Sequence, residues 1–407
     1  MDLNILLQKV KASSRKLVMV DGEEIRQSLL TLADALVKKS DEILEANKKD
    51  LSSIDAEDPI YDRVLLTEER ISDIAESVRE VARYDSPIGE IIEARTLENG
   101  LELSKVRTPI GVVGVIFEAR PNVVIDIFTL CYKSKNACVL KGGSQSIHSN
   151  QALIDIIQEI LEDKNVVVLL PNDRELIGEF LKMDEYVDVI IPRGGKGLID
   201  FVRKNSLIPV IETGAGVVHT YFDEDGDLTK GEGIVFNAKT HRPSVCNALD
   251  TLIVHSSRLK DLPALCEKLA EKKVEIFADN IAFEALEGYE YLQTATSEDF
   301  GNEYLSLKMS IKVVDNLDEA IDHINTFGSG HSEAIITENK EAADRFLKAI
   351  DAAAVYVNAS TRFTDGGVFG LGAEVGISTQ KLHARGPMGI KELTSYKWQI
   401  IGDGQTR

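Results

Sequence analysis

The sequence has few residues of the kinds that build metal sites, disulfides or nucleic-acid surfaces. Only four of its 407 residues are cysteine, at positions 131, 138, 246 and 266, and none are spaced as in a CxxC or zinc motif. We therefore expect no metal site and a cytoplasmic protein. Lys and Arg number 46 against 67 Asp and Glu, a formal charge of -21. Such a charge argues against nucleic-acid or anionic-membrane partners, because it repels phosphate groups.

Long apolar runs are also missing. No stretch approaches the roughly 20 residues that span a bilayer, so we expect no membrane segment, and nothing at the N-terminus resembles a signal peptide. What remains is a globular composition, 43% hydrophobic and 28% charged. A chain of this length is expected to divide into two or three domains.

The first hundred residues indicate helices followed by a hairpin. Residues 3–50 and 66–84 have apolar side chains at helical spacing, and Thr67 with Glu68 and Glu69 has the pattern of a helix start. Residues 91–108 form two β-type runs on either side of Asn99-Gly100, which predicts a hairpin. The hairpin either packs within its own domain or projects to another subunit.

From residue 110 the pattern becomes that of an α/β fold. Apolar runs at 110–117, 137–140, 166–170 and 187–191 are typical of parallel strands covered on both faces, and residues 311–350 predict a second sheet. Polar segments follow the first two runs, at 118–122 and 141–145. Ligands bind at the carboxyl ends of such strands, so these segments are candidate binding loops.

The fourth run leads into a glycine-rich turn, Arg193-Gly194-Gly195-Lys196, ahead of a predicted helix. Backbone amides at such a helix start can receive a pyrophosphate. The turn lacks both GxGxxG and Walker spacing, so an ordinary tight connection is the alternative. The glycines at 370–376 follow no clear strand, and we expect them to be structural.

Cys246 is the candidate nucleophile. It follows a polar loop with His241, Arg242, Pro243 and Ser244 and precedes an apolar run. Cationic neighbours favour a thiolate, and Asn247 or the backbone could face an oxyanion. The alternative is an inert packing cysteine.

Several segments together resemble one family. GVVGVIFEARPNV, ACVLKGGS, IETGAG, NAKTHRPSVCNALDTLIVH, NEYLSLKMSIKVV, INTFGSGHSEAI and GISTQKLHARGPMG are similar to the gamma-glutamyl phosphate reductases (glutamate-5-semialdehyde dehydrogenases) of the aldehyde dehydrogenase superfamily. The resemblance implies NADPH-dependent reduction of L-glutamate 5-phosphate to the 5-semialdehyde in proline biosynthesis. It also implies a homo-oligomer, and a transient contact with a glutamate kinase is a further hypothesis.

The resemblance places the site residues one by one. Cys246 matches the catalytic cysteine, Lys141 the lysine near the adenosine ribose, and Glu303 the carboxylate that holds the nicotinamide ribose. Asn122 and Arg120 stand where the superfamily has its oxyanion asparagine, and which of them faces the oxyanion stays open. Glu212 matches a base that activates water, which phosphate release does not need.

Two departures from the family pattern matter. Ser144 stands where NAD-preferring relatives carry a glutamate, so the 2′-phosphate of NADPH meets no carboxylate. Phe327 replaces a tyrosine or histidine ahead of His331. The full set of predicted site residues is Cys246 and Asn122 for catalysis; Lys141, Ser144, Gly194, Gly195 and Glu303 for the cofactor; and Arg120, Arg242, Arg362 and His331 for the substrate.

We expect an aldehyde-dehydrogenase-like α/β fold of two α/β domains with a small β oligomerisation module. Residues 1–91 and 109–230 form the NADPH domain and 231–365 the catalytic domain, while 92–108 and 388–407 form the module and 366–387 a returning segment. The rival hypotheses are a hydrolytic or coenzyme A-acylating aldehyde dehydrogenase, or a non-catalytic partner of a kinase.

Overall fold

The computed structural model describes residues 2–407. They form two compact units, one of residues 2–213, 370–376 and 387–407 and the other of residues 214–369 and 377–386. Within the described residues, no helix has the length and apolar character needed to cross a membrane. The α/β class predicted from the sequence is confirmed.

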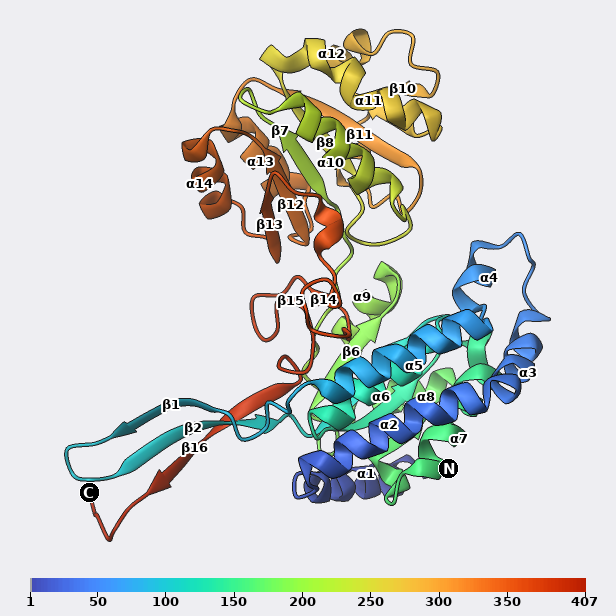
Figure 1. Ribbon diagram of the computed structural model, residues 1–407, viewed down its shortest axis with the longest axis vertical. Coiled ribbons are helices and arrows are strands. Elements are labelled where there is room, and N and C mark those ends of the chain that lie inside the picture. Colours follow the sequence, from blue (N-terminus) through green and yellow to red (C-terminus); the bar gives the residue numbers. More distant parts are fainter. Residues whose placement is uncertain (1) are drawn as a thin grey trace. The chain divides into compact units, whose positions relative to one another are not determined.

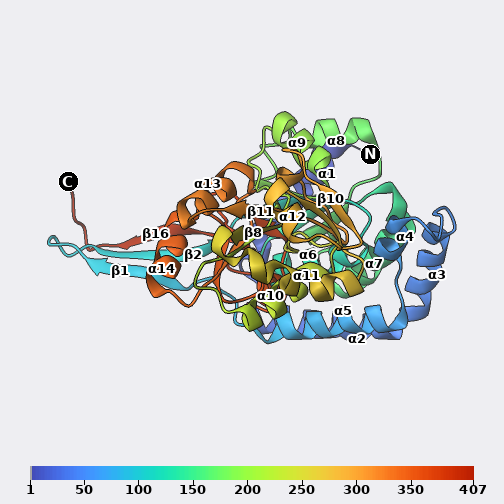
Figure 2. The ribbon, with the colours of Figure 1, turned by 90° about the horizontal axis from the view of Figure 1, so that it is seen from above.

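The first unit begins with helices that cover a small sheet. They are α1 (Leu3–Leu17), α2 (Gly22–Lys38), α3 (Ser40–Leu51), α4 (Pro59–Val64) and α5 (Glu68–Arg83). The predicted start of α5 is confirmed, since the Thr67 side chain caps the helix by accepting from the Arg70 amide. Helices α2 and α5 lie side by side in both views (Figures 1 and 2).

A four-stranded parallel sheet forms the centre of this unit, in the order β5-β4-β3-β6. Its strands are β3 (Val112–Phe117), β4 (Ala137–Lys141), β5 (Val167–Leu169) and β6 (Val189–Arg193). The connecting helices are α6 (Asn122–Lys133), α7 (Ile147–Ile160), α8 (Arg174–Phe180) and α9 (Lys196–Asn205). Because β4 and β6 flank β3 on opposite sides, the strand order reverses at β3, which is where open α/β sheets bind ligands.

A separate three-stranded antiparallel sheet, the arm, joins distant parts of the sequence. It consists of β1 (Ile91–Thr96), β2 (Glu102–Pro109) and β16 (Thr394–Ile401), with β2 in the middle (Figure 1). The hairpin predicted around Asn99-Gly100 is confirmed, with Gly100 at a φ of +86° that favours glycine. Every residue of β1 is exposed, as are seven of the eight in β16.

The second unit contains a seven-stranded parallel sheet in the order β10-β9-β11-β8-β7-β12-β13. Its strands are β7 (His219–Phe222), β8 (Thr251–His255), β9 (Glu275–Ala278), β10 (Leu292–Thr294), β11 (Lys308–Val314), β12 (Ser332–Ile336) and β13 (Ala354–Val357). Its helices are α10 (Leu228–Thr240), α11 (Leu262–Glu271), α12 (Asn280–Ala285), α13 (Leu317–Phe327) and α14 (Lys340–Ala349). A short pair, β14 (Ile377–Ser378) and β15 (Gly386–Pro387), follows.

The division between the units falls after Thr213, ahead of the domain boundary expected at residue 230. The reason is β7, which pairs with β8 and β12 in the seven-stranded sheet. Its residues are all buried, so this strand belongs to the core of the second unit. Four such residues were too short a run to assign from the sequence.

Candidate active site

The candidate thiol lies on a loop between α10 and β8. Of the four cysteines, Cys131, Cys138 and Cys266 are fully buried, whereas Cys246 is half-buried. Burial raises the pKa of the Cys266 thiol to about 12, so that thiol is inert at neutral pH. The partial exposure of Cys246 is what a nucleophile requires.

Two guanidinium groups accompany this thiol. Arg242 is exposed and has a φ of +84°, a backbone conformation that non-glycine residues rarely adopt. Arg362, on the short helix η5 (Thr361–Phe363), donates through Nε to the His241 carbonyl at 3.2 Å. The pKa of Arg362 is lowered chiefly by burial and further by the charge of Arg242, while Cys246 and Asp365 oppose the shift. An unfavourable backbone conformation, as at Arg242, next to a group with a shifted pKa, as at Arg362, is typical of functional sites.

The loop is held tightly after the thiol. Asn247 is buried, and its side-chain Nδ2 donates to the Thr364 carbonyl at 2.8 Å while its carbonyl accepts from Thr361 Oγ1 at 2.8 Å. Gly216 packs against the thiol's own peptide, because a Cβ at that position would lie 1.6 Å from the Cys246 carbonyl oxygen. Only glycine fits there. Residues 214–216 belong to the IETGAG segment of the family resemblance, which did not by itself predict that Gly216 packs against the Cys246 peptide.

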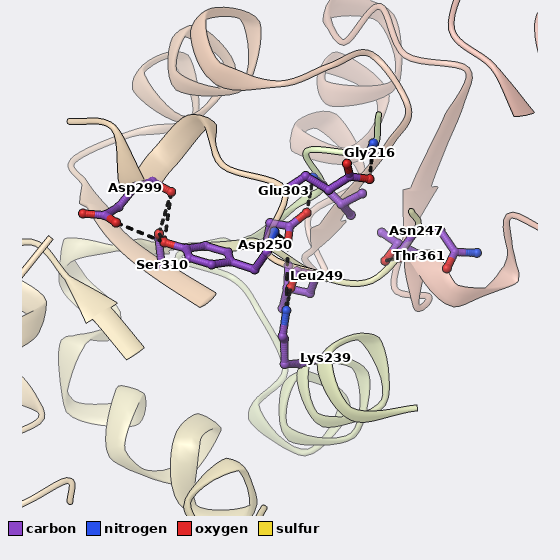
Figure 3. A network of polar contacts seen from close by, with 11 residues as sticks. Gly216, Lys239, Asn247, Leu249, Asp250, Asp299, Glu303, Ser310 and Thr361 are labelled. Carbon is purple, nitrogen blue, oxygen red and sulfur yellow. Dashed lines mark hydrogen bonds and ion pairs between the residues drawn. The ribbon is translucent and has the colours of Figure 1, made fainter. Parts of the chain in front are cut away.

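Glu303 lies close to the same backbone. Its carboxylate accepts from the Gly216 amide at 2.8 Å (Figure 3). The pKa of Glu303 is raised by burial and partly restored by that hydrogen bond. One carboxylate oxygen thus accepts from the backbone next to β7.

These residues gather at the amino ends of the parallel strands. Gly216 precedes β7, Cys246 precedes β8 and Glu303 precedes β11. In open α/β sheets, ligands usually bind at the opposite edge, where the carboxyl ends of the strands lie. The loop sequence, not its place in the sheet, was therefore the informative feature for this thiol.

His331, the fourth predicted substrate residue, is buried instead. It directly precedes β12, and its Nδ1 lies 2.8 Å from Ser332 Oγ, which contacts Thr364 Oγ1 at 2.8 Å. Burial lowers the pKa of His331 to about 4. A neutral, enclosed imidazole offers no positive charge to an anionic ligand, unlike the guanidinium groups of Arg242 and Arg362.

The remaining predicted residues belong to the first unit. Lys141 is the last residue of β4. Ser144 is exposed and is the first residue of the short helix η1 (Ser144–Ser146). Gly195 is the N-cap of α9, and its amide donates to Glu118 Oε2 at 3.0 Å. Gly194 packs against the same carboxylate, because a Cβ at position 194 would lie 2.6 Å from the carboxyl carbon of Glu118. The backbone of this turn thus binds a carboxylate of the same unit, as amides at a helix start bind anions.

The two oxyanion candidates, Arg120 and Asn122, stand just after β3. Arg120 is exposed, and Asn122 begins α6, where its Nδ2 donates to Asp126 Oδ2 at 2.9 Å. Burial raises the pKa of Asp126 to about 6, against the effects of Arg193 and Asn122. Glu212, left out of the predicted set, is half-buried, 3.9 Å from Arg203 Nε.

Among residues 2–407, no group of three or more His, Cys, Asp or Glu side chains is arranged to hold a metal ion. The polar clusters instead combine a thiol, cations and backbone amides. A thiol with cationic neighbours is a set suited to nucleophilic chemistry on sulfur.

Comparison with known proteins agrees with this chemistry. The sequence model described as the aldehyde dehydrogenase family matches residues 6–280 and 308–398. The chain belongs to the aldehyde dehydrogenase family, and it is an oxidoreductase.

Individual relatives show to which members of this family the chain is similar. Gamma-glutamyl phosphate reductase of Chlorobium phaeobacteroides (strain BS1) is 57% identical over 408 residues, covering 98% of each chain. That of Bacteroides thetaiotaomicron is 55% identical over 413 residues, covering 100% of this chain and 99% of the relative. The crystal structure of gamma-glutamyl phosphate reductase from Thermotoga maritima is 42% identical, covers 100% of both chains and has a TM-score of 0.96. Within the wider family, the chain thus groups with the gamma-glutamyl phosphate reductases, and the resemblance inferred from its sequence is confirmed.

Proposed function

We propose that this enzyme reduces L-glutamate 5-phosphate to L-glutamate 5-semialdehyde with NADPH and releases phosphate, the second step of proline biosynthesis, in the cytoplasm. The observation that carries the proposal is the half-buried Cys246 with Arg242 and Arg362 beside it. Its relatives of 55–57% identity, named gamma-glutamyl phosphate reductase, support the substrate.

The thiol performs the first step. Cys246 Sγ forms a bond to the acyl carbon while the carbon–oxygen bond to phosphate breaks, giving a thioester and free phosphate. Arg242 and Arg362 offset the charge of the phosphate in a chain with a formal charge of -21. Backbone amides near Cys246, with Asn122 as a further candidate, stabilise the carbonyl oxygen.

The second step regenerates the thiol. A bound nicotinamide supplies the hydride that the thioester carbon accepts. The bond from carbon to Cys246 Sγ then breaks, and the aldehyde leaves with the thiolate restored. Glu303 would orient the nicotinamide ribose, and Lys141, Ser144, Gly194 and Gly195 would hold the adenosine and phosphate portion. No step needs an activated water, so Glu212 has no catalytic part.

We also propose that the enzyme is a homo-oligomer assembled through the arm. Strand β16 exposes apolar and aromatic side chains on one face, at Tyr396, Trp398 and Ile400, with exposed fractions of 53%, 40% and 60%. Strands β1 and β16 are both open edges of this sheet. Such edges and apolar faces favour pairing with a second copy.

The reverse reaction tests the proposal. Glutamate 5-semialdehyde, NADP and inorganic phosphate should together produce NADPH absorbance, with no change when phosphate is omitted. A phosphate-independent signal would point to a hydrolytic relative, and dependence on coenzyme A to an acylating one. Absence of any signal with all three components present would overturn the assignment.

A further inference from the structure

A buried pair of opposite charges lies behind the thiol loop. Lys239, on the last turn of α10, and Asp250, four residues after Cys246, are 0% and 2% exposed. Lys239 Nζ lies 3.9 Å from Asp250 Oδ1 and donates to the Leu249 carbonyl at 2.7 Å (Figure 3). Lys239 Nζ therefore lies nearer to the Leu249 carbonyl of the thiol loop than to the Asp250 carboxylate.

The Asp250 carboxylate connects two further segments. Oδ1 accepts from the Tyr304 amide at 3.1 Å, and Oδ2 accepts from the Val218 amide at 3.3 Å. Each of these residues stands close in sequence to a member of the Glu303–Gly216 hydrogen bond, which measures 2.8 Å. The contacts thus close a ring: Asp250 to Tyr304, its neighbour Glu303 to Gly216, and Val218 back to Asp250.

The ring includes the backbone on which the thiol depends. Gly216 packs against the Cys246 carbonyl without room for a side chain. Leu249, three residues further along, is held by Lys239. A shift of Asp250 would therefore move the Glu303 carboxylate and the Cys246 peptide together.

Stability alone does not account for such a pair. Burying two charges costs free energy, and well-packed apolar residues of similar volume often serve a fold as well or better. Burial lowers the pKa of Lys239 to about 8 and raises that of Asp250 to about 7, with the partner's charge opposing each shift. The pair carries a desolvation cost, and its hydrogen bonds go to backbone beside the site.

We propose that Lys239 and Asp250 are positioning residues that set the Glu303 carboxylate relative to the Cys246 peptide through the backbone of Tyr304, Val218 and Leu249. The inference rests on the proposed function, since it takes Glu303 as the group that holds the nicotinamide ribose. Both residues are buried, so we expect them to act through this backbone and not on substrate or cofactor directly.

The decisive variant is Asp250→Asn. An asparagine can accept from only one of the two amides, because its NH2 group faces the other donor. NADPH affinity, measured by the fluorescence of the bound cofactor, should weaken about tenfold or more, the scale of losses from small misplacements at a site. Glu303→Gln should show the same pattern. In the reverse assay the KM for NADP should rise, while the KM for phosphate should stay within about twofold of the unmodified enzyme's.

Asp279 provides a matched control in the same unit. It accepts from the Ala282 and Val313 amides at 2.9 Å each and pairs with Lys312 Nζ at 3.0 Å. Asp279→Asn loses the same kinds of contact and should lower the thermal midpoint without changing NADPH affinity. Equal effects of Asp250→Asn and Asp279→Asn on NADPH affinity would overturn the proposal.

The double variant Lys239→Met/Asp250→Asn separates positioning from stability. Removing both charges should restore the thermal midpoint towards that of the unmodified enzyme, while NADPH affinity stays weak. Recovery of both would show that the pair serves stability alone. NADPH binding is measured without turnover, so an unmodified enzyme that binds NADPH but shows no phosphate-dependent reaction would refute the proposed function and leave this comparison valid. Failure of that enzyme to bind NADPH would overturn both.

Discussion

At the scale of single residues, exposure separates Cys246 from the other three cysteines. It alone is half-buried, beside two guanidinium groups, and the others are enclosed in apolar surroundings. Cys246→Ser should abolish turnover, a loss of order 10³-fold or more, because a serine hydroxyl without a dedicated base does not form the acyl intermediate. NADPH binding and thermal midpoint should persist.

Iodoacetamide provides the check on this assignment. It should inactivate the enzyme by labelling Cys246 first, and substrate should slow the reaction. Cys131→Ala, Cys138→Ala and Cys266→Ala are the controls, which should cost stability alone. Inactivation that tracks labelling of one of these thiols would refute the covalent mechanism.

The proposed preference for NADPH depends on Ser144. It is exposed at the start of η1, three residues after Lys141. Ser144→Glu should lower or invert the preference for NADPH over NADH, because a carboxylate there repels the 2′-phosphate and pairs with a 2′-hydroxyl. Comparing kcat/KM for the two cofactors measures this. Equal use of both cofactors by the unmodified enzyme would mean that Ser144 has no such role.

Gly216 tests the packing around the thiol. Gly216→Ala forces the Cys246 peptide to move, since the new Cβ would overlap its carbonyl oxygen. We expect kcat to fall about tenfold or more, as for other small displacements of reacting groups. Gly233→Ala is the control: nothing lies within 4 Å of its Cβ position in α10, and it should add up to about 1 kcal/mol of helix stability. Unchanged kcat in Gly216→Ala would mean that the loop tolerates displacement.

At the scale of elements, patterns in the sequence predicted more of the first unit than of the second. The runs at 110–117, 137–140, 166–170 and 187–191 correspond to β3 to β6, because long buried strands leave long apolar runs. Short strand β7 left no such run. The ring around Asp250 was beyond prediction as well, since it is made by backbone amides of segments far apart in sequence.

The arm gives the element-scale prediction. Trp398→Lys should reduce the molecular mass measured by analytical ultracentrifugation, because it places a charge on the exposed apolar face of β16. Gln399→Lys adds the same charge on the opposite face, where side chains alternate along the strand, and should leave the mass unchanged. Similar masses for the two variants would mean that this face is not an interface.

At the scale of the whole molecule, buried histidines should make the fold sensitive to acid. Burial, with the charges of His219 and Lys312 adding, lowers the pKa of His323 to about 3. The unfolded chain takes up a proton near pH 6.5 and the folded one does not, so this contribution to stability is complete above that pH and declines as the pH falls towards 3. At pH 5.5 the loss is about 1.4 kcal/mol.

His323→Phe should therefore reduce the drop in thermal midpoint between pH 7.5 and 5.5, and a phenyl ring suits the neighbouring Phe300 and Phe327. The test compares variants because Asp250 also titrates between these two pH values. Its raised pKa, about 7, makes the fold more stable as the pH falls, which opposes the effect of His323. His148→Phe, at an exposed position, is the control. An unchanged difference between the two pH values would show that His323 does not contribute.

The arm also bears on how the chain acquires its structure during synthesis. The first unit takes in residues 370–376 and 387–407, whereas most of the second is the continuous stretch 214–369. Strand β2 is synthesised well before its partner β16, so one edge of β2 stays unpaired until residues 394–401 have been added. The arm of the unit whose sequence comes first is therefore completed only after the continuous stretch of the second unit has been made.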